Sequence, residues 1–135
     1  MEAAAASPIQ ILLVLSVALL VFHIALQGML ATKELGPEWN AGPRDEARHP
    51  KGILAGRAAR ASANFRETYP GFVALALAVA LVPDTSGWDL IGGWLWFIAR
   101  LVYIPLYLAG IPYIRSLVWL VALIGLAIMA ATVIF

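Results

Sequence analysis

Polar residues recur at helical spacing in an alanine-rich part of the chain, at Arg57, Arg60, Asn64 and Glu67. At about 100° per residue they lie within an arc of about 80° on one side of a helix. Arginine pairs with carboxylates through its forked guanidinium group, and a glutamate can bind an ammonium group. This arc can therefore form one wall of a binding site for a ligand that carries both signs of charge.

A second polar stripe lies further along the chain and consists of Arg100, Tyr103 and Tyr107. These residues fall within about 60° on one helical face. Depth counted at about 1.5 Å per residue from the turn between the two helices places Tyr103 level with Glu67. The same count places Asn64 near the depth of Tyr107. We expect both stripes to face one site, although tyrosines of an interfacial aromatic belt would show the same spacing.

A further arginine, Arg115, follows a turn that contains glycine and proline. With Arg66 and Arg100 it brings three guanidinium groups to a layer that holds a single carboxylate, Glu67. A zwitterionic ligand with additional negative charge suits this set of groups. Glutathione, with two carboxylates, one ammonium and one thiol, is such a molecule.

Several of these residues can also be explained without a ligand. Arg57 and Arg60 could be the basic anchors that flank membrane spans, and Arg66 a side chain that snorkels to the interface. Glu67 is harder to explain in this way, because a carboxylate at membrane depth costs several kcal/mol unless it is paired or hydrated. The two histidines are far apart in sequence and form no metal-ligand spacing, so we expect no metal site.

The composition indicates which elements position the two stripes. Of the 135 residues, 62% are apolar and 13% are charged, which is far from the balance of a water-soluble domain. Apolar runs predict four membrane spans without β-barrel alternation, at about 9–32, 63–82, 88–109 and 112–135. We therefore predict an all-α fold, an integral membrane four-helix bundle that forms a single domain over residues 1–135.

Charge and cysteine content narrow the function classes. The net charge of +1 indicates no nucleic-acid partner, and without cysteine any sulfur chemistry must come from a bound molecule. Loop one, at residues 33–52, holds four basic and four acidic residues. All nine Lys and Arg fall at the end of the bundle that contains loop one and loop three, the connection between the third and fourth spans. This excess predicts that loops one and three are cytoplasmic and that both termini lie outside. The compact size and the lack of an evident targeting segment favour a bacterial inner membrane, with the endoplasmic reticulum as the alternative.

The run at residues 57–70, RAARASANFRETYP, resembles the signature of the MAPEG family, the membrane-associated proteins in eicosanoid and glutathione metabolism. Downstream, Arg100, Tyr103, Tyr107 and Arg115 fall where that family also places Arg, Tyr, Tyr and Arg. Together with the four spans, this resemblance covers nearly the whole chain and points to proteins similar to microsomal glutathione transferases.

The resemblance implies a homotrimer that holds glutathione between adjacent subunits near the cytoplasmic face. It implies that Arg115 stabilises the glutathione thiolate. The chain departs from the family pattern at Thr68, where several relatives have tyrosine, and in the spacing from Tyr107 to Arg115. The residues that would bind glutathione are Arg57, Arg60, Asn64, Glu67, Arg100, Tyr103 and Tyr107.

The expected function is that of a membrane-embedded glutathione transferase or glutathione-dependent peroxidase, in which the thiolate attacks a lipophilic small molecule delivered from membrane lipid. The sequence leaves open the electrophile and the choice between conjugation and peroxide reduction. A non-catalytic lipid-binding or scaffold member of the same family is one alternative. A small four-helix multidrug exporter is another, in which Glu67 would bind cations, but three arginines in its layer would repel a cationic drug.

Overall fold

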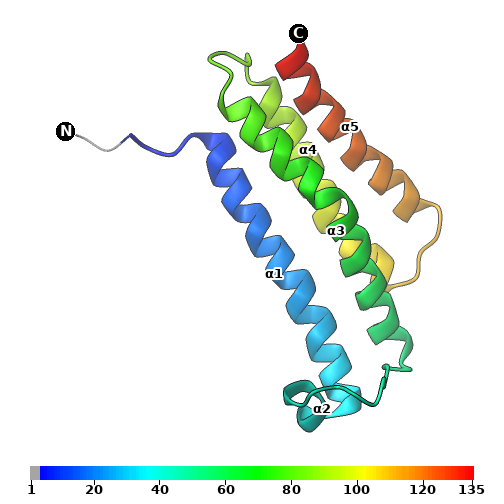
Figure 1. The fold of residues 1–135 in the computed structure, drawn as a ribbon. Helices are drawn as coiled ribbons and strands as arrows, with labels where there is room; N and C mark the ends of the chain where they lie inside the picture. The colour runs from blue at the N-terminus through cyan, green and yellow to red at the C-terminus, as the bar shows by residue number, and fades with distance from the viewer. Residues whose placement is uncertain (1–3) are drawn as a thin grey trace.

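The structure, a computed structural model, describes residues 4–135, and the regular secondary structure in that range consists of helices only. Four helices are long, and they run alternately in opposite directions (Figure 1). The all-α prediction is thereby confirmed. In chain order the elements are α1 (Pro8–Leu35), α2 (Pro37–Ala41), α3 (Ile53–Ala80), α4 (Trp88–Leu108) and α5 (Ile114–Ile134).

The bundle has two distinct ends. The start of α1, the α3–α4 turn at residues 81–87 and the end of α5 lie together at one end, which we call the hairpin end (Figure 1). The short helix α2 and the rest of residues 36–52 lie at the opposite end, which we call the loop end. The α4–α5 connection is directed toward the loop end, so the alternation expected for loops one and three is present in the fold.

Helix boundaries follow local chemistry. The Ser7 side chain accepts a hydrogen bond from the Gln10 backbone N–H, and the Gln10 side chain accepts one from the Ser7 N–H, so a capping box starts α1. Gly36 ends α1 with a φ of +96°, a conformation that glycine adopts without steric cost. At the start of α5, Pro112 and the positive φ of Tyr113 delay the helix until Ile114, two residues later than the predicted span.

Helix α3 differs from the predicted second span. It begins at Ile53, ten residues before position 63, because the alanine-rich segment with its arginines continues the helix beyond the apolar part. It ends at Ala80, and residues 81 and 82 belong to the turn before Pro83. Helices α1, α4 and α5 are each long and apolar enough to cross a membrane. Helix α3 is as long but is not among them, because its first half is polar.

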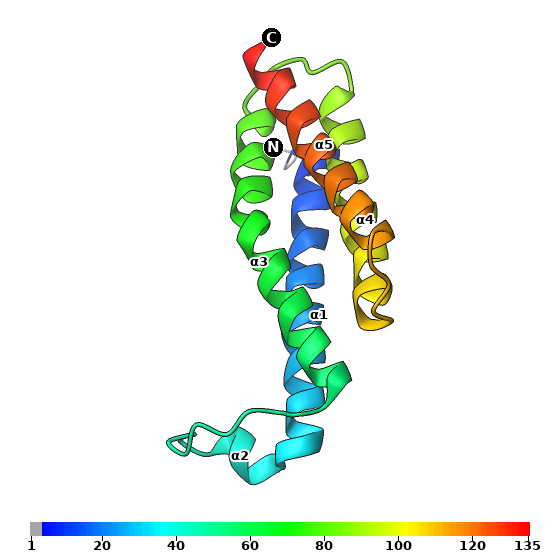
Figure 2. The ribbon, with the colours of Figure 1, turned by 90° about the vertical axis from the view of Figure 1, so that its right-hand side faces the viewer.

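The helices pack as two pairs. Helix α1 packs mainly against α3, and α4 packs most extensively against α5 (Figure 2). Glycine permits the second contact, since a Cβ atom at Gly92 would lie 2.6 Å from the Gly125 carbonyl oxygen. The short turn between α3 and α4 predicts that these helices are antiparallel neighbours, and they do run in opposite directions and contact each other, less extensively than α4 and α5 do (Figure 1).

An aromatic core joins the two pairs. Phe72 of α3 stacks on Trp96 of α4 with ring centroids 3.9 Å apart, and Phe65 stacks on His23 of α1 at 4.7 Å. Phe65, Phe72 and Trp96 are fully buried. This core fixes the relative positions of α1, α3 and α4 directly beside the polar stripes.

Candidate functional site

Arg100 is the centre of the polar region. Its side chain is 0% exposed, and its Nη1 donates a hydrogen bond to Oδ1 of Asn64 at 2.9 Å. Its guanidinium carbon lies 4.3 Å from the centre of the Tyr103 ring and 5.4 Å from that of Phe65. The two stripes predicted from the sequence therefore meet at this residue.

The buried guanidinium of Arg100 is only partly paired. Within the described chain, its Nε and Nη2 atoms have no hydrogen-bond partner. A buried charge is costly unless its hydrogen-bonding groups are satisfied, so these two donors favour the approach of an anionic group. Such a group would lie beside Asn64 and Tyr103.

A second layer lies toward the loop end. A pocket of about 200 Å³ opens there. The guanidinium carbon of Arg115 lies 4.6 Å from the centre of the Tyr107 ring, and the Tyr107 and Tyr103 rings are 5.5 Å apart. The two α4 tyrosines therefore connect Arg100 with Arg115. The pocket is lined by Arg57, Arg60, Tyr107, Gly110, Ile111, Pro112 and Arg115.

Arg57 has a structural contact in addition to its place in the pocket. Its Nη1 donates to the carbonyl oxygen of Leu108 at 3.1 Å, which satisfies a free carbonyl at the C-terminal end of α4. Gly110 makes room for this guanidinium, because a Cβ there would lie 2.5 Å from Nη2. The sequence pattern identified Gly110 as a turn signal only, and its packing against Arg57 depends on tertiary structure.

Glu67, Arg60 and Arg66 lie on the surface of the protomer. None of the side-chain hydrogen bonds among residues 4–135 involves the carboxylate of Glu67. Arg66 donates from Nε to the Ser62 carbonyl oxygen at 3.4 Å, a contact within its own helix. One protomer thus brings Asn64 together with Arg100, but leaves the carboxylate of Glu67 facing outward.

The register between α3 and α4 differs from the depth count. Asn64 was expected near Tyr107, but it contacts Arg100, about two helical turns closer to the hairpin end. The reason is that the seven residues 81–87 form a connection long enough to offset the helices, and the arginine side chain extends the contact further. The pairing of Arg57 with Leu108 follows the same register.

The electrostatic character of the pocket is positive. Arg57, Arg60 and Arg115 line it, and no carboxylate does. Guanidinium groups together with tyrosines bind carboxylate, phosphate or thiolate groups well. Among residues 4–135 no group of His, Cys, Asp or Glu could hold a metal ion.

Comparison with known families gives one match. The model of the MAPEG family matches residues 11–135, which is nearly the whole chain. The chain belongs to the MAPEG family. Neither a curated protein nor a solved structure gives a match. MAPEG proteins are associated with glutathione use and include glutathione transferases, other enzymes and non-catalytic members, and the resemblance identified from residues 57–70 is confirmed.

Membership in the MAPEG family and the apolar helices make the chain a membrane protein. The family signature on α3 contains Asn64, the residue that contacts Arg100. It also contains Phe65, whose ring lies between His23 and Arg100 and which no sequence pattern marked as part of the site. An aromatic residue beside a polar stripe gives no distinct signal in one sequence, because any buried helix face contains such residues.

Proposed function

We propose that this MAPEG protein binds glutathione at the pocket lined by Arg57, Arg60 and Arg115, which we call the arginine pocket. We further propose that it acts as a glutathione transferase or glutathione-dependent peroxidase. The observation that carries the proposal is the buried guanidinium of Arg100, whose Nε and Nη2 have no hydrogen-bond partner among residues 4–135. The rings of Tyr103 and Tyr107 connect it to the pocket that is lined by further arginines. The residues suit the molecule, since guanidinium groups pair with its carboxylates and Glu67 can bind its ammonium group.

A second subunit would complete the site. Ligand pockets usually have volumes of about 300–1,000 Å³, whereas the pocket of one protomer measures about 200 Å³. Glu67 and Arg60 are exposed and free to face a neighbouring copy. A homotrimer with glutathione between protomers, as the family resemblance implies, would bring these side chains into the site.

Arg115 is the proposed catalytic residue, because a guanidinium near the sulfur stabilises the charged thiolate. A free thiol has a pKa of about 8.5, so a decrease of about two units makes most of it thiolate at pH 7 and corresponds to about 2.7 kcal/mol. A pair of opposite charges about 4 Å apart is worth about 4 kcal/mol at an effective dielectric constant of about 20. One arginine is therefore sufficient, even in a partly hydrated pocket.

The lipophilic co-substrate would reach the pocket from the bilayer. Apolar side chains of α4 and α5, such as Leu101 and Leu117, are exposed on the helices that carry the site. Lipid-soluble electrophiles or lipid hydroperoxides partition into the same apolar environment. Their entry from the membrane would explain why the arginine pocket lies at the end of membrane-spanning helices.

Calorimetry tests glutathione binding directly. We expect the purified protein to bind glutathione and to show no heat of binding with a lipophilic cation, because the pocket is lined by arginines. The matched variant is Asn64→Leu, which removes the partner of Arg100 and should weaken glutathione binding about tenfold, at about 1.5 kcal/mol for a hydrogen bond to a charged group. Binding of the cation without binding of glutathione would contradict the proposal and support an exporter.

A non-catalytic binding member of the family is the second candidate. It is favoured by two contacts in which pocket cations already have partners within the protomer: Arg57 with the Leu108 carbonyl and Arg115 with the Tyr107 ring. Such a protein would bind glutathione or lipid but show no turnover with lipophilic electrophiles. An activity assay with an aromatic halide and a lipid hydroperoxide, run on protein that binds glutathione, distinguishes the two candidates.

The proposed location is a bacterial inner membrane with the loop end in the cytoplasm. The excess of Lys and Arg at the loop end supports this orientation, because basic residues are retained on the cytoplasmic side. The proposal places glutathione binding on the side where a cytoplasmic thiol is available.

A further inference from the structure

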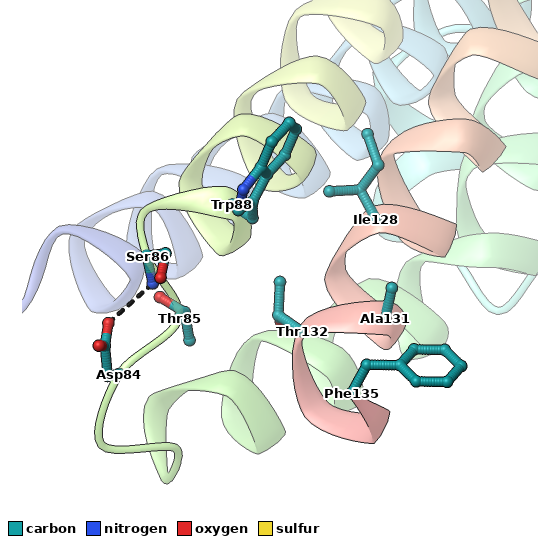
Figure 3. A pocket seen from close by; sticks show the side chains of 8 residues that line it. All are labelled: Asp84, Thr85, Ser86, Trp88, Ile128, Ala131, Thr132 and Phe135. Atoms are coloured by element: carbon teal, nitrogen blue, oxygen red, sulfur yellow. Dashed lines mark hydrogen bonds between the residues drawn. The ribbon is translucent and has the colours of Figure 1, made fainter.

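A separate hollow of about 430 Å³ lies at the hairpin end, away from the arginine pocket. Figure 3 shows Trp88 at the start of α4 facing Ile128 of α5, with Thr132, Ala131 and Phe135 along the last turns of α5. The remaining wall is the α3–α4 turn with Asp84, Thr85 and Ser86.

The hollow contains the negative charge of Asp84, and the segments that line it contain no basic residue. Asp84 is exposed, and its Oδ1 accepts a hydrogen bond from the Ser86 backbone N–H at 2.8 Å (Figure 3). Asp89 is buried and accepts a hydrogen bond from the Thr85 hydroxyl at 2.6 Å, so its carboxylate is already engaged. No Lys or Arg occurs in residues 67–99 or 116–135, which supply all lining residues. The charge of Asp84 therefore favours a cation from outside the chain.

The other walls specify what kind of cation. Trp88 is 56% exposed, and the face of an indole ring attracts ammonium groups. From Phe135 to Ile128 the α5 wall extends about 10 Å along the helix, toward the apolar middle of the bundle. Ile128 and Ala131 supply an apolar surface there. A carboxylate and an indole above an apolar wall match an amphiphile with an ammonium head and a hydrocarbon tail.

We propose that this hollow binds a phospholipid whose headgroup carries an ammonium group, as phosphatidylethanolamine does. Asp84 and Trp88 hold the ammonium group, and the acyl chain lies along Ile128 and Ala131. The continuous apolar wall favours a lipid over a soluble amine, because burial of the acyl chain adds to the attraction between the charges. This site is independent of glutathione binding at the loop end.

The test is a titration of delipidated protein with phosphatidylethanolamine, followed by native mass spectrometry. Asp84→Asn keeps an oxygen that accepts the Ser86 N–H and removes only the charge. We expect this variant to bind phosphatidylethanolamine about fivefold more weakly, as for loss of an exposed charge pair. Asp84→Glu, the matched control, should bind as the wild type does, and the affinity for phosphatidylglycerol, which has no ammonium group, should not change.

A second variant tests the position of the tail. Ala131 is exposed, so Ala131→Trp can fill the hollow without disturbing the bundle, and it should abolish the selective binding of phosphatidylethanolamine. Equal phosphatidylethanolamine affinities for the wild type and Asp84→Asn would overturn the proposal, as would binding that survives Ala131→Trp. Displacement of the lipid by millimolar ethanolamine would overturn the assignment to a lipid and indicate a soluble amine instead.

Discussion

The two ends of the bundle present pockets of opposite charge. At the loop end, a pocket of about 200 Å³ is lined by Arg57, Arg60 and Arg115, and no carboxylate lines it. At the hairpin end, a hollow of about 430 Å³ is lined by Asp84, and no lysine or arginine lines it. The aromatic core around Trp96 separates them. One small bundle thus keeps a positively charged pocket and a negatively charged hollow apart, so that each should respond to mutation without the other.

Arg100→Met is expected to have the largest effect and to weaken glutathione binding without affecting the hollow at the hairpin end. It removes a buried charge with two unpartnered donors, so glutathione should bind at least about thirtyfold more weakly, as for truncation of one partner of a buried charge pair. The free energy of unfolding should change little, because an apolar group of similar volume replaces a poorly paired buried cation. Calorimetry and thermal unfolding measure the two effects. A parallel loss of phosphatidylethanolamine binding would show that the ends are not independent.

The next prediction concerns the contact that joins α4 to α5 and supports both ends. A Cβ at Gly125 would lie 2.5 Å from the Gly92 carbonyl oxygen, so Gly125→Ala should lower the free energy of unfolding by about 1–3 kcal/mol. Gly71 is the matched control, since nothing lies within 4 Å of its Cβ position and Gly71→Ala should add up to about 1 kcal/mol through helix propensity. Denaturant unfolding in detergent compares them, and equal responses would contradict the backbone contact.

Arg57→Gln should have a smaller effect. Loss of the hydrogen bond to the Leu108 carbonyl should lower the free energy of unfolding by about 1 kcal/mol, because this carbonyl at the C-terminal end of α4 then has no charged donor. Arg60→Gln, at an exposed position of the same pocket, should change stability by less than about 0.5 kcal/mol. Thermal unfolding of both variants measures the difference, and the opposite order would refute the capping role of Arg57.

The smallest expected effect on stability comes from single cysteine substitutions on the surface. Their labelling reports which end of the bundle faces which side of the membrane. The chain has no cysteine, so single variants Asp45→Cys and Ser86→Cys are free of background labelling. Both positions are exposed, at the loop end and at the hairpin end. An impermeant maleimide applied to intact bacterial spheroplasts should label position 86 and leave position 45 unlabelled. The reverse pattern would place the arginine pocket outside the cytoplasm.

Much of the architecture could be predicted from the sequence because it depends on local patterns. Apolar runs located all four long helices, although α3 begins ten residues before the predicted span. The polar spacing on α3 and α4 correctly predicted that Asn64 and Arg100 share one region. The family signature in residues 57–70 is likewise local, and the family match over residues 11–135 confirms it.

The remaining features depend on tertiary packing. The backbone contact between Gly92 and Gly125 pairs α4 with α5, yet neither glycine reveals in sequence which helix it will approach. The register between α3 and α4 could not be counted from the turn, because a seven-residue connection permits several offsets. The contact of Arg57 with Leu108 depends on that register, and so could not be foreseen either.

The most direct test of glutathione activation at the arginine pocket is a pH titration of bound glutathione, followed through the ultraviolet absorbance of its thiolate. A nearby cation favours the charged form and lowers the thiol pKa, so the wild type should show the thiolate band about two pH units below the free thiol, whose pKa is about 8.5. Arg115→Ala should move the titration back toward the free value, and Arg115→Lys should retain part of the shift. A wild-type titration that matches free glutathione, or one that Arg115→Ala leaves unchanged, would contradict the account.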